Sequence, residues 1–410
     1  FDYVFFALGF GFINYNTVVP AFAVQLGASE AMVGALITAL LLAWTLPQLV
    51  AGNLVTRAPS KRAVVIRMAL LGRPAILGLA LVILLTQARP AWLSLAALSL
   101  AYAAFFGTDA FCTVAWLDLL GRAIAPEKRG SSIGIWQVVK AVGLSGVAAT
   151  VGYVLSDQGP PFPLNFALLF GAASLLLGLS IVAQLNIYEP ATPHHESEAS
   201  HIRWRDFGPY LARIWRGDSR FRRISIARVL FALSTMSFPF YVLYATEELH
   251  FPTRAIGLFI FGQTVGTSVA SLFLGRVADR HGAQRVIQIG GAIALTAPLL
   301  ALAIALSGQS VISLLSRAYI WIYICIGLAD NLMMLGYLNY VYDVSPTEQR
   351  SIYMGLFNTV AGIGMLGPIV AGWVVSWASY AALFAVSFVL GAGALALAFR
   401  LPLARNLTEP

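Results

Sequence analysis

The stretch GRVADRHGAQR, residues 275–285, lies between two long apolar runs. It is rich in charge and contains two glycines, whereas the runs at roughly 255–275 and 286–306 are almost purely apolar. Each run has about the 20 residues that an α-helix needs to cross a bilayer core. The pattern therefore predicts a short charged loop between two membrane-spanning helices.

Similar apolar runs recur along the whole chain. They cover roughly 3–22, 31–55, 64–85, 91–120, 132–155 and 164–185, and, after a polar stretch, 224–244, 255–275, 286–306, 318–342, 352–375 and 380–401. Short alternating segments typical of a transmembrane β-barrel do not occur in the sequence. We therefore predict an all-α integral membrane protein with about 12 transmembrane helices.

The composition points to the same class. Of 410 residues, 59% are hydrophobic and 11% charged, and the mean hydropathy is +0.79. Soluble domains carry roughly a quarter charged residues. Cys112 and Cys325 both lie in apolar runs, so neither a disulfide framework nor a metal site is indicated. The sequence contains no Gly-x-x-x-x-Gly-Lys motif and no catalytic triad, so we expect no cofactor, no ATP drive and no enzyme activity.

The net charge of +8 reflects membrane topology rather than nucleic-acid binding. If both termini lie in the cytoplasm, only Arg89, Arg254 and Arg317 fall in outer loops, and nearly all other loop Lys and Arg residues fall inside. This distribution satisfies the positive-inside rule. We predict a multi-pass protein of the inner plasma membrane that functions as a monomer.

One long polar segment divides the chain near its middle. We predict a six-helix bundle over 1–186, a cytoplasmic linker over 187–221 and a second six-helix bundle over 222–410. Within the linker, HIRWRDFGPYLARIWR (residues 201–216) has apolar side chains at helical spacing between arginines. This predicts an amphipathic helix on the inner membrane surface, with binding to a soluble partner as the alternative.

The two halves share an internal repeat. With an offset of 221 positions, APEKRGSSIG (125–134) matches SPTEQRSIYMG (345–355) apart from one inserted residue. In this register Asp109 matches Asp330 and Trp116 matches Tyr337. Parallel repeats of this kind are a transporter architecture, with the solute site at their interface. We expect two bundles related by pseudo-symmetry.

The 275–285 stretch resembles the loop signature of the major facilitator superfamily, Gly-x-x-x-Asp-Arg-x-Gly-x-x-Arg. The resemblance extends over the whole chain, through the helix count, the central linker and the positions of the loops. The first-half copy at 52–62 departs from the signature, with Thr56 and Pro59 in place of the acid and the second glycine. The resemblance implies a secondary transporter in which helices 1, 4, 7 and 10 line a central cavity.

Asp109 and Asp330 are the first candidates for chemistry. Each lies about a dozen residues from a cytoplasmic helix end, which at about 1.5 Å rise per residue is near the midplane. Ionisable groups at that depth are functional candidates by default. With Trp116 and Tyr337 on the same helix faces, the aspartates would suit a cationic or amphipathic solute, or exchange protons. Alternatively, each aspartate is paired with a nearby Arg or Lys and only braces the helices.

Two cations are also expected within the spans. Lys140 could bind an anionic substrate or neutralise an aspartate, whereas Arg73 lies on a helix that the family places peripherally and favours a structural role. The remaining polar candidates for solute contacts are Asn14, Asn16, Gln137, Gln263 and Asn358. Hydrogen bonds between helices are the alternative role for each.

A set of charged residues at helix ends is predicted to gate the cavity. Charge networks there would hold one conformation and break on opening, while glycines permit a tight loop. The candidates are Gly275, Asp279, Arg280, Gly282, Arg285, Asp118, Arg129 and Arg350. The alternative is that their charges only fix topology.

The sequence as a whole predicts secondary transport of a small organic solute by alternating access, with protons as a candidate coupling ion. A non-transporting receptor or assembly factor, or a facilitative uniporter, remains the alternative. The fold does not determine the substrate.

Overall fold

A computed structural model describes residues 1–123, 126–189, 212–307, 318–346 and 350–401 of the chain. These residues form helices and turns, and no strand occurs among them. The N-terminal helices are α1 (Asp2–Phe12), α2 (Val18–Gln25), α3 (Glu30–Arg57), α4 (Lys61–Gly72), α5 (Pro74–Thr86), α6 (Ala91–Ala123), α7 (Pro126–Val154) and α8 (Leu164–Gln184). The C-terminal helices are α10 (Ser219–Ser234), α11 (Phe238–Leu243), α12 (Ala255–Ala305), α14 (Ile320–Val344), α15 (Arg350–Ala361), α16 (Gly367–Trp377) and α17 (Tyr380–Phe399).

Among the described residues, 11 helical segments are long and apolar enough to span a membrane. The first predicted span is not one of them, because it is broken into α1 and α2 around residues 13–17. This break explains the difference from the expected twelve. The protein is thus an all-α multi-pass membrane protein, as predicted.

Several predicted spans consist of more than one helical piece. Pro74 begins α5 after a break at Arg73, and Pro239 and Pro368 lie in the first turns of α11 and α16. Proline lacks the backbone N–H that a continuous helix would need at these points, so the breaks coincide with it. Short segments η1 (Thr235–Ser237), η2 (Tyr244–Glu248) and η5 (Gly362–Leu366) connect the pieces.

Side-chain caps define several helix starts. The Ser29 hydroxyl accepts from the Met32 N–H at 3.4 Å, and the Ser60 hydroxyl accepts from Ala63 N–H at 3.1 Å. The Asp218 carboxylate accepts from Arg220 and Phe221 N–H groups at 2.9 Å each. Such caps satisfy N–H groups that have no partner within the helix.

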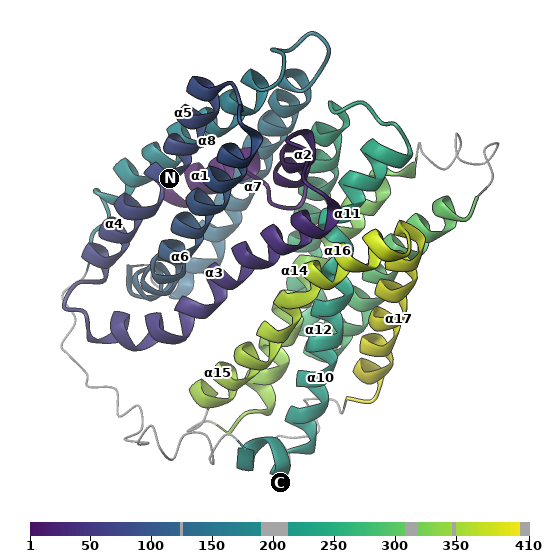
Figure 1. Cartoon of the computed structure of the whole chain (residues 1–410). Coiled ribbons are helices and arrows are strands. Elements are labelled where there is room, and N and C mark those ends of the chain that lie inside the picture. The colour runs from purple at the N-terminus through teal and green to yellow at the C-terminus, as the bar shows by residue number, and fades with distance from the viewer. Residues whose placement is uncertain (124–125, 190–211, 308–317, 347–349, 402–410) are drawn as a thin grey trace.

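The two groups of helices contact each other at one end. There α3 packs against α16, α7 against α12, and α2 against α11. Figure 1 shows α3 reaching α16 at this meeting point, while the groups diverge toward the ends that carry α4 and α15. Thr38 of α3 accepts a hydrogen bond from the Ile369 N–H of α16 at 2.9 Å.

Glycines allow this close approach. A Cβ added at Gly257 of α12 would lie 2.7 Å from the Cα of Gly152 in α7, and one added at Gly372 would lie 2.6 Å from the Glu30 carbonyl oxygen. Small residues let helix backbones approach within membranes. The bundles are therefore closed against each other where α7 ends and α12 begins.

Most of the linker lies outside the described residues. The amphipathic helix expected over 201–216 falls largely there, although residues 212–217 form a helical turn before α10. The boundaries 1–186, 187–221 and 222–410 stay predictions.

Candidate functional site

A cavity of about 740 Å³ lies between the two bundles. Helices α1 and α7 line one side, and α12 and α14 line the other. Its polar lining consists of Tyr3, Asn14, Gln137, Lys140, Gln263, Thr264, Thr267, Ser268, Ser271 and Asn331. The central cavity thus brings together four of the predicted site residues, Asn14, Gln137, Lys140 and Gln263.

One hydrogen bond crosses the cavity at the closed end. Asn14 Nδ2 donates to Gln263 Oε1 at 3.5 Å, which is long for such a bond. Asn14 Oδ1 meanwhile accepts from the Asn16 N–H at 2.9 Å, which holds the chain where α1 ends. Asn16 is itself buried and supports this turn.

The α12 wall carries a row of hydroxyl groups that sequence reasoning missed. Thr264, Thr267, Ser268 and Ser271 follow helical spacing, and this periodic polar stripe within an apolar run is the signal that would have identified them. Asn331 Nδ2 donates to Ser271 Oγ at 2.8 Å and to the Thr267 carbonyl at 3.3 Å. These contacts tie α14 to α12 and keep the stripe in place.

Lys140 lies half-buried on the α7 wall. Its Nζ donates to the Tyr3 hydroxyl at 3.1 Å and lies 5.3 Å from the centre of the Tyr3 ring. No carboxylate lies within 4.0 Å of it among the residues that the structure describes. The central cavity therefore contains an ammonium group whose described partner is a neutral phenol.

Asp109 lies in a separate, smaller pocket. This side pocket, of about 180 Å³, lies inside the N-terminal bundle and is also lined by Asp2, Arg73 and Trp116. The Asp109 carboxylate accepts hydrogen bonds from Thr113 at 3.4 Å and from Trp44. The two pockets share Tyr3 and Phe6.

Asp330 faces the C-terminal bundle's own arginine. It interacts electrostatically with Arg228 of α10 and with Tyr15, which belongs to the other bundle. The residue is exposed, and these interactions involve one group from each bundle. Neither aspartate is among the described residues that line the central cavity. The expected common cavity for the pair is therefore not observed, because Asp109 is turned into its own bundle.

The matched aromatic residues also differ in surroundings. Trp116 stacks on Tyr3 with ring centres 5.9 Å apart in the side pocket. Tyr337 is buried, with the Arg228 guanidinium 5.3 Å from its ring centre. Asn358 is exposed on α15 and is not part of the described cavity lining.

Comparison with known proteins relates the C-terminal half of the chain to a family and the whole chain to a fold. Residues 224–409 match the sequence model of the Major Facilitator Superfamily. The fold resembles the nucleoside transporter NupG, with a TM-score of 0.66 and 16% identity over 100% of this chain and 98% of that one. It also resembles a bacterial homologue of the iron transporter ferroportin in an inward-facing state (TM-score 0.64, 14% identity, 97% and 96% coverage).

A third solved structure, the peptide transporter POT in complex with alafosfalin, aligns over 98% of this chain and 93% of that one, with a TM-score of 0.66 and 15% identity. No curated protein sequence matches the chain. The family match in one half and the shared fold over both halves agree with the loop signature. The sequence match to the Major Facilitator Superfamily covers the C-terminal half of the chain, and the likeness to solved transporters over both halves is one of fold.

The superfamily signature loop, residues 275–285, lies in the middle of α12. The helix is interrupted at Gly282, whose φ of 79° is in the left-handed region that favours glycine. Arg285 donates from Nη1 to Gln288 Oε1 at 2.9 Å. The side chains of Asp279 and Arg280 lie outside the described part of the structure, and so does the environment of Gly275. The same holds for the side chains of Asp118, Arg129 and Arg350, so the gating network stays a prediction.

Proposed function

We propose that this protein is a secondary transporter of a small solute with an anionic group, and that Lys140 binds that group. Lys140 is the only charged residue among the described lining of the central cavity. Attraction between unit charges is much stronger in a low-dielectric cavity than in water. An ammonium group whose described hydrogen-bond partner is a phenol is therefore suited to a carboxylate, sulfonate or phosphate. This differs from the cationic solute expected from the sequence, which assumed that both aspartates line this cavity.

The rest of the cavity favours a polar solute of modest size. A volume of about 740 Å³ lies within the range of small-molecule sites, roughly 300–1,000 Å³. Amides of Asn14, Gln137 and Gln263 and the hydroxyl stripe of α12 offer both donors and acceptors. A sealed and purely apolar cavity would have favoured a receptor, and the polar lining supports transport instead.

Asp330 is our candidate for proton coupling. It is exposed and interacts electrostatically with Arg228, so the balance of charge there changes when it gains a proton. Asp109, inside its own bundle, is less directly connected with the solute.

The contact between the bundles determines the side of the membrane to which the cavity opens. They contact each other around Gly152 and Gly257. With both termini in the cytoplasm, as the positive-inside rule predicts, this closed end faces outward and the cavity is open toward the cytoplasm. Alternating access would then move the bundles over 1–186 and 222–410 against each other in the inner membrane, within a monomer.

The experiment is a thermal-shift screen of the purified protein, followed by uptake into proteoliposomes. A panel of small carboxylates, sulfonates and phosphates is compared with neutral and cationic compounds of matched size. We expect the stabilising compounds to be anionic and to be taken up by the wild-type protein. Stabilisation by cationic compounds alone would contradict the proposal.

A further inference from the structure

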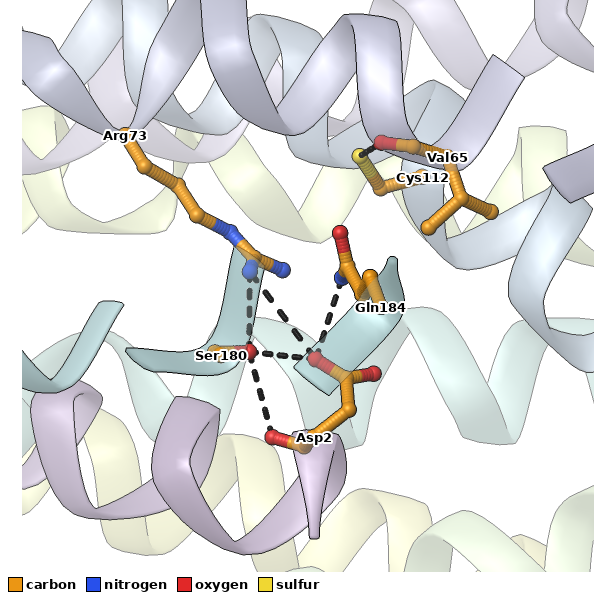
Figure 2. A network of polar contacts seen from close by, with 6 residues as sticks. All are labelled: Asp2, Val65, Arg73, Cys112, Ser180 and Gln184. Atoms are coloured by element: carbon orange, nitrogen blue, oxygen red, sulfur yellow. Dashed lines mark hydrogen bonds and ion pairs between the residues drawn. The ribbon is translucent and has the colours of Figure 1, made fainter. Parts of the chain in front are cut away.

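The side pocket inside the N-terminal bundle has a polar floor that Figure 2 shows from close by. Asp2 Oδ1 lies 3.9 Å from Arg73 Nη1 and accepts from Gln184 Nε2 at 3.0 Å. The Ser180 hydroxyl accepts from Arg73 Nη1 at 2.8 Å and donates to the Asp2 carboxylate. In this network the charges of Asp2 and Arg73 balance each other.

Asp109 adds a second carboxylate to the same pocket without adding a cation. Its described hydrogen-bond partners, Thr113 and Trp44, are neutral, and Arg73 is already engaged by Asp2 and Ser180. Among the described lining residues, helix α8 contributes the uncharged Gln184, and the other ionisable groups are Tyr3 and Cys112. The described pocket thus has one more carboxylate than it has cations, at a depth where uncompensated charge is costly.

Gln184 is an independent observation that points to a ligand. Its side chain is only 1% exposed and lines the pocket. Its Nε2 is used by Asp2, but its Oε1 has no hydrogen-bond partner among the described residues. In Figure 2 this oxygen is directed away from Asp2, on the side of the pocket where Cys112 lies. A buried carbonyl oxygen of this kind requires a donor or a cation.

The residues that line the side pocket determine which kind of cation it can bind. Tyr3, Phe6 and Trp116 surround the pocket with aromatic rings, and Val65 and Leu117 add apolar surface. A bare metal ion needs oxygen ligands on all sides, which these walls do not offer. An organic ammonium group instead gains from aromatic faces, and its carbon substituents pack against apolar walls.

We propose that the side pocket binds a small organic ammonium compound. Its N–H groups donate to the Asp109 carboxylate and to Gln184 Oε1, while Tyr3 and Trp116 contact its carbon skeleton. A volume of about 180 Å³ accommodates a compound with a single ring or a short chain. Because Tyr3 and Phe6 also line the central cavity, the ligand reaches the pocket from there. This binding is independent of the anion that Lys140 is proposed to hold.

The test uses benzylammonium as the probe and the full-length purified protein in detergent. Benzyl alcohol and benzoate serve as neutral and anionic compounds of the same size. Binding is measured by equilibrium dialysis, and tryptophan fluorescence of wild type and Trp116→Phe reports whether the ligand lies beside Trp116. We expect saturable binding of benzylammonium, at least about tenfold weaker binding of benzyl alcohol, and none of benzoate.

Variants locate the ligand. Asp109→Asn and Gln184→Leu should each weaken benzylammonium binding about tenfold or more, since each removes one acceptor. Gln263→Leu makes the matched change in the central cavity and should alter binding less than about twofold. Should Gln184→Leu fail to fold, Trp116→Leu replaces it and should weaken binding several-fold.

Three results would overturn the proposal. The first is absence of benzylammonium binding to the wild-type protein. The second is binding that survives Asp109→Asn but is lost in Gln263→Leu, which would put the amine in the central cavity. The third is a fluorescence response to sodium chloride without any response to benzylammonium, which would indicate a metal cation. None of these results depends on whether an anion is transported.

Discussion

Lys140 Nζ donates a hydrogen bond to the hydroxyl of Tyr3 at 3.1 Å, which joins α7 to α1 at the wall between the two pockets. The phenol thereby fixes the direction in which the ammonium group points. Tyr3→Phe keeps the ring and its stacking on Trp116 but removes the acceptor. We expect an anionic solute to bind several-fold more weakly, in line with about 1 kcal/mol for one hydrogen bond. Calorimetric titration of wild type and Tyr3→Phe checks this, and unchanged affinity would show that Lys140 needs no such support.

The contact between Gly152 and Gly257 is predicted to hold the closed end together. Gly257→Ala would put a methyl group against the α7 backbone and favour separation of the bundles there. A cysteine introduced at Glu248 should then react faster with a membrane-impermeant maleimide. Gly146→Ala, in α7 but with open space around it, is the matched control. Equal labelling rates of the introduced cysteine in Gly257→Ala and Gly146→Ala would argue against this contact as a gate.

Glu189 is predicted to stabilise the start of α4. Its carboxylate accepts from the Ser60 hydroxyl at 2.6 Å, the Lys61 N–H at 2.8 Å and the Arg62 N–H at 3.2 Å. It thereby caps a helix whose first turn is basic, where the helix dipole favours negative charge. Glu189→Ala should destabilise the protein by about 1–2 kcal/mol. Thermal unfolding measures this change, with a substitution at an exposed position, Asp157→Ala, as the control. Equal midpoint temperatures of unfolding for the two variants would show that Glu189 does not stabilise the start of α4.

Asp330→Asn tests proton coupling. The variant keeps the size of the side chain but cannot exchange a proton, so accumulation against a gradient should fall to equilibration. Exchange of solute down its gradient should persist, since binding and coupling are separable. Proteoliposomes with an imposed pH gradient, loaded with an anionic compound from the screen, provide the measurement. Asp157→Asn is the control, and full accumulation by Asp330→Asn would exclude this residue as the coupling site.

Much of the architecture could be predicted because a bilayer imposes a simple rule on sequence. Apolar runs of about 20 residues mark helices, and they predicted the all-α membrane fold and its two groups of helices. The split of the first span into α1 and α2 was not predicted. Residues 13–17, Ile-Asn-Tyr-Asn-Thr, are more polar than their neighbours, and Asn and Thr favour non-helical backbone by bonding to nearby backbone groups. Reading the run for hydropathy alone passed over this signal.

The site was harder to predict, because its geometry depends on helix rotation. The repeat relates Asp109 to Asp330 in sequence, yet Asp109 lines a pocket within its own bundle, whereas Asp330 is exposed and interacts with Tyr15 of the other bundle. The difference follows from their partners, since Arg73 follows α4 in one half and Arg228 lies on α10 in the other. Hydropathy patterns carry no information about such pairings. The α12 hydroxyl stripe, in contrast, was visible in the spacing of Thr264, Thr267 and Ser271.

The most direct test of the account is the affinity of the best anionic compound from the screen for three proteins: wild type, Lys140→Arg and Lys140→Gln. Calorimetric titration gives each dissociation constant under the same salt conditions. Removing the charge should weaken binding about tenfold or more, whereas arginine should retain most of the affinity because the positive charge is kept. Equal affinity of wild type and Lys140→Gln would contradict the claim that Lys140 binds the anionic group of the solute in the central cavity.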